Sequence, residues 1–194
     1  MPDRIVTGTY LFGAMAAGGD IELKDAPVEQ LSSVLAVIQS MGGRIKSDSV
    51  NNIISLHVPD NIHNVDYVET GIYPQFPTDL QSPLLVAACI AQGTLILKEN
   101  IFSGRFKIME ELIRMGADIE RGNKENIVVI HGGKKLEGRN VIARELRGGA
   151  ALIIAGIAAK GLTIVTDTCY IRRGYEDIAG DFNKLGACIM ETKI

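Results

Sequence analysis

Three stretches of the chain carry apolar residues at the spacing of an amphipathic helix. In the first, Leu31, Val34, Leu35 and Ile38 fall at positions i, i+3, i+4 and i+7, which places them on one helical face. The same stripe recurs at Ile108, Leu112 and Met115 and at Ile178, Phe182 and Leu185. A glycine follows each stripe, at Gly42, Gly116 and Gly186. Because glycine is the usual left-handed residue after a helix, the pattern predicts three helices and their ends.

Two further segments are apolar at every position. Leu84–Ala91 and Ala150–Ala155 have no polar face, so a helix in either place must be buried on all sides. The predicted strands, by contrast, carry polar residues such as Glu22, Lys98 and Thr163, which indicates that one sheet face meets solvent. The combination predicts helices on the inside and strands on the outside.

These elements recur as three related units of about 70 residues, approximately 1–64, 65–137 and 138–194. Each has an apolar run, a glycine, a strand, an amphipathic helix, a second glycine and a second strand; the glycine pairs are Gly19 and Gly42, Gly93 and Gly116, and Gly161 and Gly186. The second strand of the third unit falls at Ala187–Ile189 and includes Cys188. We therefore expect residues 1–194 to form a single α/β domain of inside-out, barrel-like architecture, with buried helices and outer sheets.

One strand of this plan is missing. Units one and two continue with strands at Ile53–Val58 and Ile127–His131, each beginning 11 residues after the second glycine. The counterpart in unit three would begin near position 197, beyond the sequence. Another segment or chain is expected to supply that strand, and Met1 would then be an internal methionine of a longer protein. An open sheet edge also invites association with a second copy.

Composition narrows the class of protein. The chain has 194 residues, of which 46% are hydrophobic and 22% charged, with a net charge of −3. This balance supports a folded core and argues against broad binding to nucleic acid or anionic membranes. The start of the chain lacks a signal-peptide pattern, and no apolar run is long enough to span a bilayer, so we expect a cytoplasmic protein. No metal-ligand spacing or nucleotide-cofactor motif is present, so no metal or cofactor is expected.

Charged residues occupy equivalent positions of units two and three. Asp79 and Arg147 each lie 14 residues before the first glycine of their unit, and Arg105 and Arg173 lie 12 residues after it. All four fall near predicted helix starts, where an arginine opposes the helix dipole by about 0.3–1 kcal/mol. Either an anionic ligand lies between these arginines and the helix N-termini, or each arginine pairs with a nearby carboxylate. Examples of such carboxylates are Glu110, Glu145 and Glu176.

Asp79 also has two interpretations. Thr78 could cap the buried helix, with Asp79 in its first turn as a favourable charge. Alternatively, the Asp79 carboxylate accepts a hydrogen bond from a substrate hydroxyl or takes its proton. Among the cysteines, Cys89 lies in an apolar helix and is expected to be buried and inert, whereas Cys169 lies in a loop and is the one to test for reactivity.

At these residues the chain resembles the carboxy-terminal part of the UDP-N-acetylglucosamine 1-carboxyvinyltransferases, the enolpyruvyl transferase family of peptidoglycan synthesis. The segments that carry the resemblance are Pro2–Thr9, Phe76–Gln81, Ile101–Phe106, Leu146–Ala150 and Ile171–Glu176. Each segment alone is weakly specific, but together they follow the family's order and spacing over nearly the whole chain.

The resemblance implies the enolpyruvyl transferase fold and a transferase that moves the enolpyruvyl group of phosphoenolpyruvate to the 3-hydroxyl of UDP-N-acetylglucosamine, releasing phosphate. It also implies site residues. Asp79 would bind that hydroxyl and serve as the base, and Ile101 would contact the nucleotide sugar. Arg105, Arg147 and Arg173 would form a cationic wall, with Arg147 and the catalytic Arg173 toward phosphoenolpyruvate. The implied setting is cell-wall biogenesis in the cytoplasm, with its links to cell shape, division and the cell cycle.

The departures from the family matter as well. The family's amino-terminal domain, which carries a mobile loop with the Cys or Asp proton donor, is absent from this sequence, and so is the family's amino-terminal Lys-Asn pair. In the family a short amino-terminal stretch also completes this domain's sheet. We therefore expect the chain alone to turn over no substrate. The alternatives are the sister enzyme, 3-phosphoshikimate 1-carboxyvinyltransferase, and a non-catalytic binding or scaffold domain.

Overall fold

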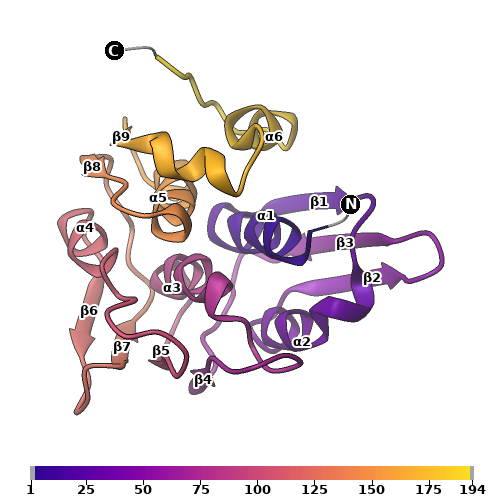
Figure 1. Ribbon diagram of the computed structural model, residues 1–194, viewed down its shortest axis with the longest axis horizontal. Coiled ribbons are helices and arrows are strands. Elements are labelled where there is room, and N and C mark those ends of the chain that lie inside the picture. Colours follow the sequence, from indigo (N-terminus) through magenta and orange to yellow (C-terminus); the bar gives the residue numbers. More distant parts are fainter. Residues whose placement is uncertain (1–2, 193–194) are drawn as a thin grey trace.

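Three helices lie side by side at the centre of the molecule (Figure 1). They are α1 (Arg4–Ala17), α3 (Gln81–Ile90) and α5 (Leu146–Ala158), and each packs against the other two. The computed structural model describes residues 3–192. Met1, Lys193 and Ile194 lie outside the described residues, as does Pro2, the first residue of the segment Pro2–Thr9. Within that range, no helix is both long and apolar enough to cross a membrane.

Short strands surround this helical centre (Figure 1). Within residues 3–192 they form three sheets. The first has the order β1-β3-β2, with β1 (Gly19–Leu23), β2 (Arg44–Asp48) and β3 (Ile53–Val58). The second has the order β4-β5-β7-β6, with β4 (Tyr67–Glu69), β5 (Thr94–Lys98), β6 (Asp118–Arg121) and β7 (Ile127–His131). In the third, β8 (Asn140–Ile142) pairs in parallel with β9 (Ile164–Thr166).

The first two sheets repeat one antiparallel pattern. Asp20 of β1 lies opposite His57 of β3, and Thr94 of β5 lies opposite His131 of β7, at equivalent positions of the two units. Along β3 and β7, buried residues alternate with more exposed ones, so one sheet face covers the core and the other meets solvent. The repeat seen in the sequence is therefore a repeat of topology.

The predicted amphipathic helices are α2 (Ser32–Ser40), α4 (Met109–Arg114) and α6 (Ile178–Lys184), the first preceded by a 3-10 turn at Val28–Leu31. The glycines after them, Gly42, Gly116 and Gly186, have φ values of 102°, 99° and 100°. A residue with a Cβ would be strained at such angles, which confirms the predicted helix ends.

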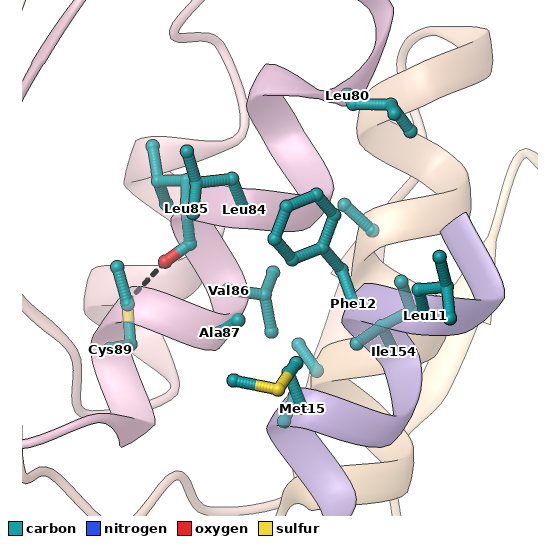
Figure 2. Close-up of a cluster of buried hydrophobic side chains, with 14 of the residues drawn as sticks. Leu11, Phe12, Met15, Leu80, Leu84, Leu85, Val86, Ala87, Cys89 and Ile154 are labelled. Atoms are coloured by element: carbon teal, nitrogen blue, oxygen red, sulfur yellow. Dashed lines mark hydrogen bonds between the residues drawn. The ribbon is translucent and has the colours of Figure 1, made fainter. Parts of the chain in front are cut away.

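The core lies between α1, α3 and α5, and Figure 2 shows its centre. Phe12 of α1 points from its helix toward α3, among fully buried side chains that include Leu84 and Ile154. Its ring also lies 6.1 Å from that of Phe76, centroid to centroid. Burial of these apolar surfaces drives the three helices together.

The strand predicted at Ala187–Ile189 is wrong, and Cys188 is therefore not a sheet residue. In the first two sheets, β2 and β6 pair with the central strands β3 and β7. No central strand lies beside β9 within residues 3–192, so this segment has no ladder to join. Instead, the Asn183 amide accepts from the Ile189 N–H and donates to the Ile189 carbonyl.

Helix α5 of the third unit is less completely buried than its counterpart α3. Ile153 and Ile157 of α5 are only partly buried, whereas the matching helix α3 is buried from Gln81 to Cys89. The prediction that the second all-apolar helix is buried on every side is thus correct only in part. The two-stranded sheet β8-β9 covers less of α5 than the four-stranded sheet covers of α3.

The cysteines give a direct test of burial. Cys89 lies inside α3, where its thiol donates to the Leu85 carbonyl (Figure 2) and burial raises its pKa to about 12. Cys169 and Cys188 are exposed. We expect a thiol reagent such as Ellman's reagent to modify two of the three cysteines in the native chain, and all three only in denaturant. Rapid native reaction of Cys89, identified by peptide mass, would contradict this packing.

Candidate functional site

Three of the four charged residues singled out by the sequence meet at one point. Asp79 lies in the 3-10 turn Thr78–Leu80 that leads into α3, Arg147 is the second residue of α5, and Arg105 lies in the loop between β5 and α4. Asp79 Oδ1 accepts a hydrogen bond from Arg105, and Asp79 Oδ2 accepts one from Arg147 at 3.2 Å. One carboxylate thus bridges two guanidinium groups.

Helix packing explains why they meet. Because α3 and α5 pack against each other, residues at equivalent positions near their starts come together. Asp79 offsets the unfavourable position of Arg147 in the first turn of α5. The arginines do pair with a carboxylate, as one interpretation held, but for Arg105 and Arg147 that carboxylate is Asp79.

The ion pairs of Arg105 and Arg147 with Asp79 leave some guanidinium N–H groups without a partner within residues 3–192. The side chains of Arg105 and Arg147 are only 16% and 14% exposed. Arg105 Nε and Arg147 Nη1 are buried and find no hydrogen-bond partner among residues 3–192. Buried donors without partners cost about 1–3 kcal/mol each, and charged ones more. Two such donors on neighbouring guanidinium groups indicate a place for an additional anion.

One expectation about this region, the role of Arg173, stays a prediction, and another, the cap at Thr78, is corrected. Arg173 is exposed at the end of the 3-10 helix Thr168–Arg173, and within residues 3–192 it makes no ion pair or side-chain hydrogen bond. It lies five residues before α6, too early for the first turn of that helix. Thr78 does not cap α3, because its hydroxyl donates to Glu99 instead.

Glu99 is a residue that the sequence analysis missed. Its side chain is buried, and Oε1 accepts from the backbone N–H groups of Ile101 and Phe102 at 2.7 and 3.1 Å. Its Oε2 accepts from the Thr78 hydroxyl at 3.0 Å. Glu99 therefore ties the loop that carries Ile101 and Arg105 to the turn that carries Asp79. A glutamate at the end of a strand gives no sequence signal of this role.

Ile101 faces a cavity next to the cluster. The cavity has a volume of about 250 Å³, and its lining includes Arg4, Tyr73, Asp79 and Ile101. The Arg4 guanidinium lies 5.0 Å from the centre of the Tyr73 ring. A ligand in this cavity would meet an apolar side chain, a stacked cation and the Asp79 carboxylate. Among the described residues, no three His, Cys, Asp or Glu side chains gather to hold a metal ion.

Glu145 is a second missed residue. It precedes α5 without capping it, and its Oε1 is buried without a hydrogen-bond partner within residues 3–192. Burial raises the pKa of the Glu145 carboxyl, Arg105 and Lys107 oppose that rise, and Asp79 adds to it. The sequence indicates Glu145 only as a partner for arginine, because burial of a single carboxyl is decided by tertiary packing.

The raised pKa of Glu145 predicts a pH dependence. At a pH between the pKa of Glu145 in the unfolded chain and its higher pKa in the folded chain, the folded chain binds more protons at this carboxyl than the unfolded chain does. The free energy of unfolding therefore falls as pH rises through this range. Glu145→Gln removes the charge, and we expect it to increase the free energy of unfolding at pH 7. The gain should vanish below about pH 4, where the unfolded carboxyl is protonated as well.

Urea denaturation of the wild type and Glu145→Gln across pH 3–8 measures this difference. Asp48→Asn is the control of opposite sign, because hydrogen bonds from Asn51 and Val50 lower the pKa of Asp48. Asp48→Asn should therefore destabilise the chain at pH 7. A Glu145→Gln chain that is less stable than the wild type at pH 7 would contradict the burial of an uncompensated charge.

Comparison with known proteins matches the chain to one enzyme family and to relatives that share one enzyme name. Residues 1–182 match the family model described as EPSP synthase (3-phosphoshikimate 1-carboxyvinyltransferase). A UDP-N-acetylglucosamine 1-carboxyvinyltransferase 2 from Caldanaerobacter subterraneus subsp. tengcongensis is 40% identical over 98% of this chain and 45% of its own length. A UDP-N-acetylglucosamine 1-carboxyvinyltransferase from Klebsiella pneumoniae is 40% identical over 100% of this chain and 45% of its own length.

Solved structures agree on the fold. The enolpyruvyl transferase NikO from Streptomyces tendae superposes with a TM-score of 0.82 at 24% identity, covering 97% of this chain and 44% of that one. EPSP synthase from Acinetobacter baumannii gives a TM-score of 0.78 at 19% identity, covering 100% of this chain and 48% of that one. The chain thus spans less than half the length of the relatives it matches.

Proposed function

Because the chain belongs to the EPSP synthase family of enolpyruvyl transferases, we propose that it is one half of a UDP-N-acetylglucosamine 1-carboxyvinyltransferase. The substrates would be UDP-N-acetylglucosamine and phosphoenolpyruvate, and the reaction a step in peptidoglycan precursor synthesis in the cytoplasm. The observation that carries the proposal is the cluster in which Asp79 bridges Arg105 and Arg147 and leaves two buried guanidinium donors free within residues 3–192.

The residues of the cluster suit this chemistry. Phosphoenolpyruvate carries a phosphate and a carboxylate, and the free donors on Arg105 and Arg147 would bind such oxygens. Asp79 would accept a hydrogen bond from the sugar 3-hydroxyl and take its proton as the oxygen adds to phosphoenolpyruvate. Ile101, in the adjoining cavity, would pack against the nucleotide sugar. Fixed positive charge would stabilise phosphate as it leaves. Arg173 is exposed, so it would join the cationic wall of Arg105 and Arg147 only from the solvent side.

The rest of the site would come from the other half. The proton that the enolpyruvyl methylene gains on addition needs a donor, and we assign it to the Cys or Asp loop of an amino-terminal domain. We also propose that the three units form an inside-out barrel, and that a segment outside residues 3–192 pairs with β9. The partly open face of α5 supports that addition.

Reconstitution tests the proposed function. We expect no phosphate release from the chain alone with UDP-N-acetylglucosamine and phosphoenolpyruvate, and release when the amino-terminal half of a relative is added in trans. Shikimate 3-phosphate in place of the nucleotide sugar should give none. Turnover with shikimate 3-phosphate would favour the sister enzyme that names the family model. A reconstituted protein that neither turns over nor is stabilised thermally by either acceptor would favour a scaffold domain.

A further inference from the structure

A buried tyrosine outside the reacting groups contacts Arg147 directly. The Arg147 guanidinium lies over the ring of Tyr175, with its central carbon 5.6 Å from the ring centre. Tyr175 is 3% exposed, so the contact is shielded from water. A cation over an aromatic face is attracted more strongly when the pair is shielded from water than when it lies at the surface.

The hydroxyl of Tyr175 is anchored to the central helix α1. It lies 2.7 Å from Thr9 Oγ1, and that oxygen lies 2.8 Å from the Ile5 carbonyl. A carbonyl can only accept, so the single hydroxyl proton of Thr9 is used there and Tyr175 must donate to Thr9. The orientation of the ring is therefore fixed by a buried, directional hydrogen bond to α1.

The backbone at Gly174, next to Tyr175 in the chain, also lies close to the guanidinium. A Cβ on Gly174 would lie 3.0 Å from Arg147 Nη1, the atom without a partner within residues 3–192. The absence of a side chain at Gly174 leaves room for Nη1 there. The Tyr175 ring and the Asp79 carboxylate thus both contact the Arg147 guanidinium, and its Nη1 has no partner within residues 3–192.

We propose that Tyr175, anchored by Thr9, is a positioning residue that orients Arg147 toward an anionic substrate. The assignment of that anion to phosphoenolpyruvate rests on the proposed function; the orientation of Arg147 does not. The ring restrains rotation of the guanidinium, and the hydroxyl restrains the ring. Loss of the ring should therefore disturb Arg147 more than loss of the hydroxyl alone.

The test is nuclear magnetic resonance of arginine side chains in the full chain, with the Arg147 signals assigned from Arg147→Lys. We expect separately resolved Nη protons of Arg147 in the wild type and in Tyr175→Phe, and loss of that separation in Tyr175→Leu. Tyr10→Leu is the matched control, because Tyr10 of α1 is also buried but its hydroxyl donates elsewhere, to Asp181. It should lose stability and leave the Arg147 signals unchanged. Unchanged Arg147 signals in Tyr175→Leu would overturn the proposal.

Titration of phosphoenolpyruvate into the same samples separates the positioning role of Tyr175 from the proposed function. If it shifts the Arg147 signals of the wild type, Tyr175→Leu should raise its dissociation constant about ten-fold and Tyr175→Phe about two-fold or less. An equal affinity in Tyr175→Leu would count against the positioning role. Failure of phosphoenolpyruvate to shift wild-type Arg147, in the presence of the amino-terminal half, would count against the proposed function and leave the orientation to be judged by the Nη signals.

Discussion

Phe12→Ala should lower the free energy of unfolding by about 3–5 kcal/mol, because it deletes a fully buried ring and leaves a cavity. Phe12 lies where α1, α3 and α5 meet (Figure 2), and the surrounding helices cannot close the gap without losing contacts with each other. Domains of this size are stable by about 5–15 kcal/mol in total, so this change would remove a large share. Urea denaturation followed by circular dichroism measures it.

Phe102→Ala is the matched control for Phe12→Ala. Phe102 is 52% exposed, so the same deletion there should cost less than about 1 kcal/mol. If both variants lose the same stability, the three-helix interface is not the core of the fold.

Arg147→Met should reduce phosphate release by the reconstituted enzyme about 10²–10³-fold. The change keeps most of the side-chain length but removes the charge that would face phosphoenolpyruvate, and loss of a single transition-state donor typically has an effect of this size. Phosphate release at saturating substrate and phosphoenolpyruvate titrations would separate a loss of turnover from a loss of binding.

Arg139→Met is the control for Arg147→Met. Arg139 is half-exposed and pairs with Glu137 rather than with Asp79. It should retain near wild-type activity. Full activity in Arg147→Met would remove this arginine from the site.

The fold was largely predictable because its repeating pattern is local. Helices α2, α4 and α6 each have a stripe of apolar residues and a glycine after their end, and both signals are visible in a few residues. The strands β4 and β8 were not predicted, because three residues in parallel pairing carry no periodic signal. The failed strand at Ala187–Ile189 has a non-local cause, since it depends on a neighbouring strand.

The part of the candidate site that lies at equivalent positions of the repeated units could be predicted from the sequence. Asp79 and Arg147 occupy equivalent positions near the starts of packed helices, and counting from the glycines was enough to bring them together. Arg173, the counterpart of Arg105, lies at the end of a 3-10 helix, and its place in the site stays a prediction. Partners chosen by tertiary packing, such as Glu99 for Thr78 and Asp79 for Arg105, have no sequence signature.

A crystal structure of the reconstituted enzyme with UDP-N-acetylglucosamine and phosphoenolpyruvate tests the central claim most directly. We predict phosphate or carboxylate oxygens within hydrogen-bond distance of Arg105 Nε and Arg147 Nη1, and the sugar 3-hydroxyl on Asp79. Ligands bound elsewhere, with both arginines still paired only to Asp79, would contradict it.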